Sequence, residues 1–237
     1  MLRKDPNRRR PRAGSAQRAA GASRATAARF VLYVEGARDR DILESWARRA
    51  QPSVARAIER NTVILGGRRP ARAADDFRRR GGHAKGWRGL VVLDRDHHEP
   101  DENGVHHDGD QQQADGLELF VWGRRHIESY LLVPSAIRRV VGSGVDAARI
   151  EQALADPALM RGGDGRGEIA ALHAKRILGA GGSLSEALGT DLHAGEIARA
   201  MRAEELHADV HSLLDRIGAL SGTLDKGPEV VIRPPRG

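Results

Sequence analysis

The stretch RFVLYVEGARDRDIL (29–43) and the stretch GLVVLDRD (89–96) decide the fold of this chain. Each begins as an uninterrupted apolar run and ends on carboxylates, Glu35 after the first run and Asp94 and Asp96 after the second. Apolar runs without alternation are typical of parallel strands buried on both faces. Ligands of open α/β sheets bind at the carboxyl ends of such strands. The pattern therefore indicates a site for a divalent cation and magnesium-dependent chemistry on phosphates.

Apolar strands alternate with helical patterns through the first half of the chain. The predicted strands are 30–34, 62–65, 90–93 and 117–122, and the predicted helices between them are 39–50 and 71–80. This order favours right-handed crossovers, and so an α/β fold with a parallel sheet of about four strands flanked by helices. After a short helical or irregular segment at 127–132, the chain becomes rich in Ala and Leu. The helices expected there are 147–155, 166–178, 184–188 and a broken 194–220.

These patterns predict four parts: a basic disordered tail (1–29), a catalytic domain (30–133), a helical extension (134–222) and a second tail (223–237). The net charge is +7, but the first tail carries nine Lys or Arg against one Asp, a net +8 that leaves −1 for the rest. Such a tail either holds nucleic acid by neutralising phosphates or is only an unstructured extension. Both interpretations stay open.

Composition excludes several classes of site. The 237 residues include no cysteine, which rules out disulfides, thiolate zinc sites and cysteine nucleophiles. Aromatic residues make up only 3%, so the core must depend on aliphatic side chains. Neither an apolar run of about 18 residues nor the apolar region of a secretory signal is found. No membrane association and a cytoplasmic location are the expectations.

The acids at the strand ends form a constellation suited to a hard cation. Asp94 and Asp96 flank Arg95, so alternation along a strand puts both carboxylates on one face. Glu35 lies nearby if the two strands are neighbours, and Asp39 follows in the first turn of the next helix. Like charges this close oppose each other's ionisation unless a cation joins them. The alternative for each single acid is a turn residue or a helix cap.

With these motifs in this order, the segment 30–132 resembles the Toprim domain of topoisomerases, bacterial primases and several nucleases. VLYVEGARDRDIL resembles its glutamate motif and VVLDRD its Asp-x-Asp motif. The resemblance implies a compact Rossmann-like sheet with Mg²⁺ held by Glu35, Asp94 and Asp96.

A narrower resemblance comes from WGRRHIESYLLVP (122–134), which is similar to the segment after Asp-x-Asp in OLD-family nucleases and related stand-alone Toprim proteins. It implies that Glu128 joins the metal cluster and that Asp39 is a ligand of a second ion. It also implies a catalytic lysine, for which Lys175 in LHAKRIL is the candidate. The expected catalytic residues are then Glu35, Asp94, Asp96 and Lys175. Two Mg²⁺ or Mn²⁺ ions are the expected cofactors. No phosphate-binding loop of an ATPase occurs in this chain, so any ATPase is a separate subunit or absent.

Two further groups of residues are candidates for binding. The segment 68–88 has a net charge of +6 and would position a nucleic-acid backbone, unless it is a solvated helix face. Its basic residues are Arg68, Arg69, Arg72, Arg78, Arg79, Arg80, Lys85 and Arg88. The His-rich loop 97–110 is either a transition-metal site or an adventitious metal binder. His126 either orients water or phosphate or simply begins a helix.

The resemblance thus implies a metal-dependent endonuclease that hydrolyses phosphodiester bonds of DNA or RNA, in a phage-defence or repair setting. Water is the expected nucleophile, because Tyr33 and Tyr130 lie in apolar runs typical of packing residues. Two alternatives remain: a Toprim ribonuclease acting on structured RNA, and a non-catalytic module that binds nucleic acid or a partner. Assembly into a homo-oligomer also stays open.

Overall fold

Four parallel strands form the centre of the molecule in a computed structural model that describes residues 29–95, 115–156, 174–179 and 181–223. The strands are β1 (Arg29–Val34), β2 (Thr62–Ile64), β3 (Trp87–Leu93) and β4 (Leu117–Val121). They lie in the order β2-β1-β3-β4, and every neighbouring pair is parallel. The predicted α/β class with a four-stranded parallel sheet is confirmed, with strand ends within three residues of those expected.

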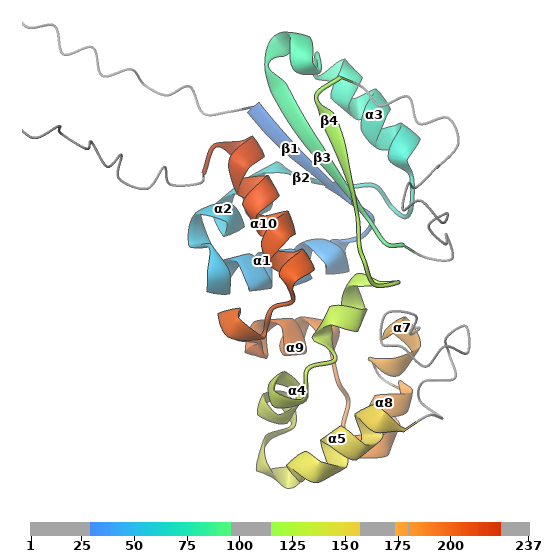
Figure 1. Cartoon of the computed structure of the whole chain (residues 1–237). Helices are drawn as coiled ribbons and strands as arrows, with labels where there is room; N and C mark the ends of the chain where they lie inside the picture. The colour runs from blue at the N-terminus through green and yellow to red at the C-terminus, as the bar shows by residue number, and fades with distance from the viewer. Residues whose placement is uncertain (1–28, 96–114, 157–173, 180, 224–237) are drawn as a thin grey trace, which may run out of the picture.

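The sheet is buried on both faces, which explains why its strands show no polar alternation. Along β1, Phe30, Leu32 and Val34 face one apolar core while Val31 and Tyr33 face another. The smaller core lies under α3 (Pro70–Arg79), which covers its face of the sheet through Ala73, Ala74 and Phe77. The larger core lies under α1 (Ala37–Ala50), α2 (Pro52–Asn61) and α10 (Ala208–Ser221) on the opposite face (Figure 1).

The crossover from β1 to β2 contains α2, a helix that was not predicted. Pro52 stands at its first position, where a missing N–H costs nothing. Val54, Ala55 and Ile58 turn inward from one side of α2. These apolar positions, spaced as on one face of a helix, were a usable sequence signal for α2, which packs on α1.

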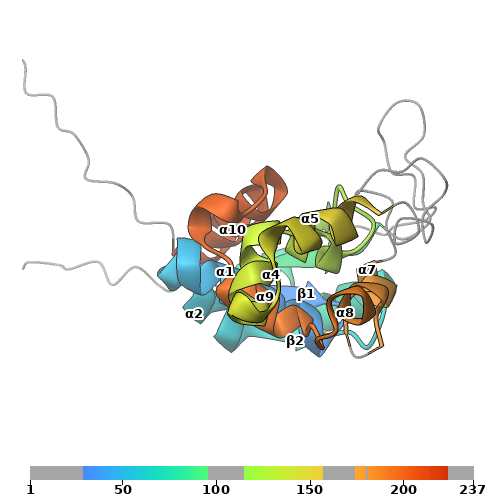
Figure 2. The same cartoon turned by 90° about the horizontal axis from the view of Figure 1, so that it is seen from below.

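The second half of the chain folds into short helices beyond the carboxyl ends of the strands (Figures 1 and 2). They are η2 (Ile127–Leu131), α4 (Pro134–Val141), α5 (Ala147–Ala155), α7 (Ala174–Ile177), α8 (Ser183–Leu188) and α9 (Ala194–Ala200). Single 3₁₀ turns occur at η1 (His83–Lys85), η3 (Gly142–Gly144) and η5 (Ala203–Glu205). α9 packs on α1 and α4, and α10 returns to the sheet, so these helices share the larger core with the strands.

The broken helix expected over 194–220 is two helices, α9 and α10, separated by η5. The chain leaves α9 at Met201 in an extended conformation, and the Arg202 N–H then donates to the Glu205 carboxylate at 2.9 Å. Of the predicted helix 166–178, the described part is helical over Ala174–Ile177. In the described residues, no helix has the length and apolar character needed to cross a membrane. The predicted domain limits stay predictions, with the sheet itself beginning at Arg29.

Candidate active site

Glu35 and Asp94 meet at the carboxyl ends of the two central strands. Because β1 and β3 pair in register, Val34 opposite Val92, the residues that follow them emerge side by side. The Glu35 carboxylate accepts a hydrogen bond from the Asp94 backbone N–H at 2.9 Å, and the Arg68 guanidinium donates to the Asp94 backbone carbonyl. Asp94 is therefore fixed from both sides at its main chain.

The Asp94 side chain, buried to 4% exposure, is surrounded by donors from the second half of the chain. Its Oδ1 accepts the Ile127 backbone N–H at 2.9 Å, and its Oδ2 lies 2.8 Å from Lys175 Nζ and 3.3 Å from His126 Nδ1. Burial alone would raise the pKa of Asp94, but the hydrogen bonds from His126 and Lys175 outweigh it and lower that pKa. Asp94 is thus held as a carboxylate.

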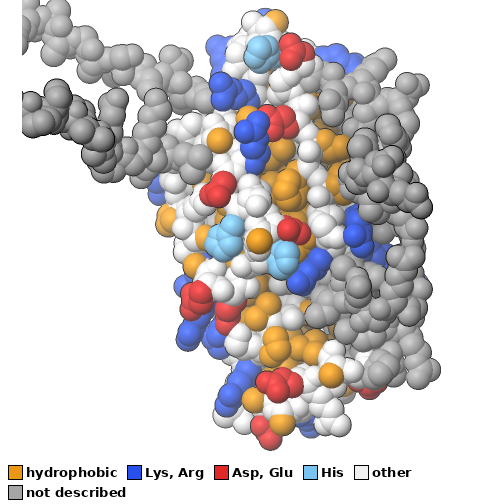
Figure 3. Space-filling model, viewed as in Figure 1, with side chains coloured by type: hydrophobic (Ala, Val, Ile, Leu, Met, Phe, Trp, Pro, Cys, Tyr) orange, Lys and Arg blue, Asp and Glu red, His pale blue; other side chains and the backbone are white. Residues whose placement is uncertain are grey.

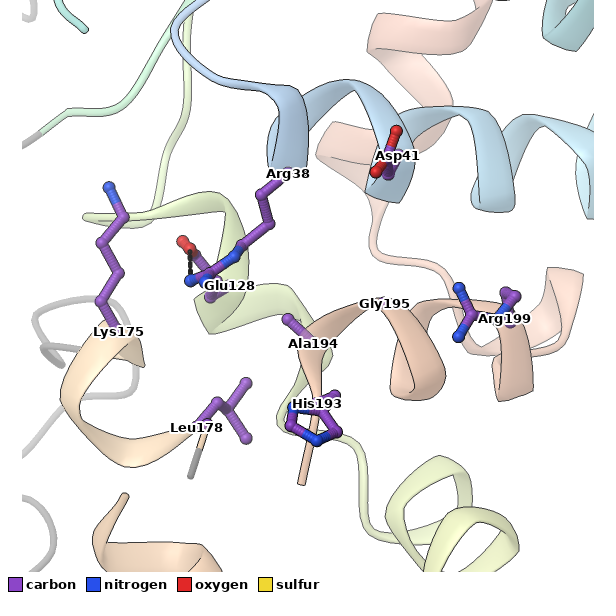
Figure 4. A pocket seen from close by; sticks show the side chains of 10 residues that line it. Arg38, Asp41, Glu128, Lys175, Leu178, His193, Ala194, Gly195 and Arg199 are labelled. Carbon is purple, nitrogen blue, oxygen red and sulfur yellow. Dashed lines mark ion pairs between the residues drawn. The ribbon is translucent and has the colours of Figure 1, made fainter. Parts of the chain in front are cut away.

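Glu128 lies on η2 and is almost completely buried, at 1% exposure. Its Oε1 lies 3.5 Å from the Arg38 guanidinium, which is itself largely exposed on α1 (Figure 4). Its other oxygen, Oε2, is buried and has no hydrogen-bond partner in the described part of the chain. A buried carboxylate oxygen without a donor is costly, so this position suits a cation.

Asp39 lies in the first turn of α1 and shares the electrostatic field of the other acids. The pKa of Asp39 is raised to about 6, mainly by burial. The negative charges of Asp94 and Glu128 also raise this pKa, whereas the hydrogen bond from the Gly36 N–H and the charge of Lys175 lower it. The Gly36 N–H donates to Asp39 Oδ2 at 2.8 Å. Asp39 therefore caps its helix, as the alternative interpretation expected, and it also interacts electrostatically with the other acids.

Lys175 is the cation of this cluster, and it comes from α7, more than 80 positions after Asp94 in the sequence. Burial alone would lower its pKa, but the hydrogen bond to Asp94 and the charges of Asp94, Glu128 and Asp39 raise it. The ammonium group is therefore charged, and it lies among three carboxylates. Asp39, Asp94, Glu128 and Lys175 are hereafter called the acidic cluster.

The loop before η2 is anchored to α10, which fixes the position of Glu128. The Tyr130 hydroxyl accepts the Arg124 N–H at 2.9 Å and donates to the Asp209 carboxylate. A Cβ on Gly123 would lie 2.7 Å from Asp209 Oδ2, so only glycine allows this close approach. The return of α10 to the sheet thus contributes to the geometry of the site.

The chemistry of these side chains fits a hard divalent cation, although they do not enclose one by themselves. Asp39, Asp94 and Glu128 are the oxygen ligands that Mg²⁺ prefers, and Glu128 Oε2 is unpartnered. Among the described residues, however, no three His, Asp or Glu side chains are gathered closely enough to hold a metal ion. Asp96, the remaining predicted ligand, and the His-rich loop 97–110 lie outside the described residues.

The basic segment 68–88 does not form one surface beside the acidic cluster. Arg72 donates to the Leu65 carbonyl at 2.7 Å, and Arg68 to Asp94, at the carboxyl ends of the strands. Arg88 lies at the start of β3, about 20 Å from Asp94 at about 3.3 Å per residue. Arg78, Arg79 and Arg80 pair with the acids of α3, Asp75 and Asp76. On the face shown in Figure 3, acidic and basic side chains are interspersed. A role of this segment in binding nucleic acid stays a prediction.

Sequence reasoning missed Arg38, His193 and Arg199, which line a pocket next to the acidic cluster (Figure 4). Arg38 follows Glu35 by three residues, within the glutamate motif, so its position was a usable signal. His193 and Arg199 belong to α9 and its N-terminal cap, and no local pattern indicates that this helix lies beside η2. His126 was recognised as a candidate, and its ring lies against Asp94.

We predict that replacing Asp39 by asparagine stabilises the metal-free protein at neutral pH. The pKa of Asp39 is higher in the folded state than its ordinary value of 3.8, so ionisation costs folding free energy as pH rises through 6. The asparagine keeps an acceptor for the Gly36 N–H without the charge. Urea unfolding in EDTA should show a gain of about 1–3 kcal/mol at pH 7.5 that shrinks towards pH 4. Asp41→Asn, at an exposed position of α1, is the control, and a gain that does not depend on pH would contradict the prediction.

Comparisons with known proteins complete the description. No protein-family model and no curated protein matches the chain. Among solved structures, the chain is similar to the C-terminal region of the OLD protein of Xanthomonas campestris pv. campestris, with 17% identity and a TM-score of 0.44 over 82% of this chain and 96% of that chain. It is also similar to the C-terminal region of the Burkholderia pseudomallei OLD protein, with 19% identity and a TM-score of 0.42 over 81% and 98%. Likenesses this distant carry no argument about function, which depends on the side chains described above.

Proposed function

We propose that the chain is a divalent-metal-dependent nuclease of the Toprim type, which hydrolyses phosphodiester bonds of nucleic acid. The observation that carries the proposal is the acidic cluster, in which carboxylates from α1, from the end of β3 and from η2 lie near one lysine. The charges of Asp94 and Glu128 help to raise the pKa of Asp39, and a divalent cation near these acids would offset their repulsion. The same cluster lies where open α/β sheets bind their ligands.

The roles of the residues follow from their contacts. Glu35, Asp94 and Asp96 would hold one Mg²⁺ or Mn²⁺ ion, and Asp39 and Glu128 would help to hold a second. Two such ions, when bound, supply positive charge to the attacking and leaving oxygens of an in-line displacement. Lys175, already charged beside Asp94, would neutralise the charge that develops on the phosphate. His126 would keep Asp94 in its orientation.

The tyrosine hydroxyls favour hydrolysis over transfer to the protein. Tyr33 donates to Asp76 at 2.9 Å and Tyr130 donates to Asp209, and both side chains are buried. Burial, with the neighbouring carboxylates, raises the pKa of each hydroxyl above its ordinary value. A phenol held in this way is a poor nucleophile, so water is the expected attacking group.

A non-catalytic module that binds nucleic acid or a partner is the second candidate. One observation favours it: both carboxylate oxygens of Asp94 already accept hydrogen bonds from the protein.

A third candidate, cleavage of structured RNA, uses the same cluster with another substrate. A separate ATPase subunit and a defence or repair setting belong to the proposal through the OLD-like motifs.

The test is cleavage of labelled DNA and RNA with Mg²⁺, with Mn²⁺ and with EDTA. We expect cleavage that depends on the cation and falls at least about 100-fold in Glu128→Gln, because the buried oxygen atoms lose their negative charge. Glu151→Gln, on an exposed position of α5, is the matched control and should cleave like the parent. If binding persists while no substrate is cleaved with either cation, the chain is a binding module.

A further inference from the structure

A pocket of about 340 Å³ opens beside the acidic cluster, towards the C-terminal helices. Its walls come from α1, η2, α7 and α9, and Figure 4 shows Glu128 and Lys175 at one side and Arg199 at the other. Glu128 and Lys175 belong both to the pocket and to the acidic cluster. A molecule in this pocket would therefore lie directly beside the proposed reaction site.

Each of the two acids that line the pocket lies beside an arginine, whereas one of the cations of the pocket has no acid beside it. Glu128 lies 3.5 Å from Arg38, and Asp41 is paired with Arg40 at 2.8 Å. The guanidinium of Arg199 has no hydrogen-bond or ion-pair partner within the described ranges of the chain, and it is turned to the pocket in Figure 4. An unpaired planar donor next to a phosphate-processing site suits a second phosphate.

The size of the pocket restricts what can enter. Its volume lies at the lower end of the roughly 300–1,000 Å³ typical of small-molecule sites. One nucleotide fits such a volume, while a base pair held in a duplex does not. Leu178 and Ala194 add an apolar surface against which a sugar or base can pack. The lining thus combines a cation for phosphate with an apolar wall.

We propose that this pocket binds one unpaired nucleotide of the substrate strand, with Arg199 on the phosphate next to the one that is cleaved. The inference rests on the proposed nuclease function and gives it a substrate class: single strands, or duplex ends and junctions that offer an unpaired nucleotide. Arg38 and His193 flank the same position and would limit how the strand enters.

Binding of a labelled short single strand to the whole chain in EDTA tests the inference without cleavage. Fluorescence anisotropy should show an affinity loss of about tenfold for Arg199→Ala, as expected when one charge-assisted contact to phosphate is removed. Arg199→Lys should recover part of this loss. Arg56→Ala, on an exposed position of α2, removes an equal charge and should lower the affinity no more than about twofold. Thymidine monophosphate should compete with the strand for the parent protein.

Duplex binding and cleavage separate the possible outcomes. For a blunt duplex of the same sequence, Arg199→Ala and Arg56→Ala should have equal and small effects. If Arg199→Ala and Arg56→Ala also lower the affinity for the single strand equally, the proposed nucleotide pocket is wrong. This holds even if Mg²⁺-dependent cleavage by the parent supports the nuclease function. A specific loss at Arg199 without cleavage of any substrate would support the pocket as a nucleotide site and remove the nuclease function.

Discussion

Replacement of Asp94 by asparagine should reduce Mg²⁺-dependent cleavage by about 10³-fold or more. The asparagine keeps the size of the side chain and an acceptor for the Ile127 N–H, so the main-chain contacts with Glu35 and Arg68 survive. The negative charge is lost at the point where Lys175 and His126 converge. Single-turnover rates at saturating substrate measure this effect separately from substrate binding.

The control for Asp94→Asn is Asp191→Asn, which removes the same charge at an exposed position after α8. Both variants should remain folded in thermal unfolding. Cleavage by Asp94→Asn within about tenfold of the parent would contradict the prediction.

The junction of Glu35 and Asp94 was predictable because parallel strands in register deliver their following residues to one edge. The apolar runs are long enough to identify β1 and β3. Because these strands pair in register, the acids that follow the two runs lie at the same edge of the sheet. The exact contact was not predictable: the Glu35 carboxylate accepts the Asp94 main-chain N–H, rather than facing its side chain. Hydrogen bonding of a main-chain donor leaves no trace in a pattern of residue types.

The contribution of the C-terminal helices could be predicted only in part. Lys175 was singled out through the resemblance, and its short helix lies where its ammonium group contacts Asp94. Arg199 could not be found in this way, because its helix reaches the site only through packing of α9 on α1 and α4. The anchoring of Tyr130 by Asp209 is equally non-local, since it joins residues that are 79 positions apart.

Replacement of Lys175 by methionine should lower cleavage by about 10²–10³-fold while the affinity for Mg²⁺ stays unchanged or rises. The lysine neutralises charge on the phosphate, and its loss removes that contribution to the transition state. In the metal-free protein the same ammonium group lies 2.8 Å from Asp94 and also stabilises the charges of Glu128 and Asp39. A cation that binds these carboxylates therefore competes with Lys175, and methionine removes the competitor. The cleavage rate and the affinity for Mg²⁺ should therefore not fall together.

Mg²⁺-dependent thermal stabilisation measures the affinity in the parent and in the variant, since a ligand of the folded state raises the unfolding temperature according to its concentration. Arg176→Met, at the exposed neighbouring position of α7, is the matched control and should change neither quantity. Lys175→Arg keeps the charge and should retain more cleavage than methionine. Equal losses of Mg²⁺ affinity and of cleavage in Lys175→Met would show that the lysine only orients Asp94, and its assigned action on the phosphate would then be wrong.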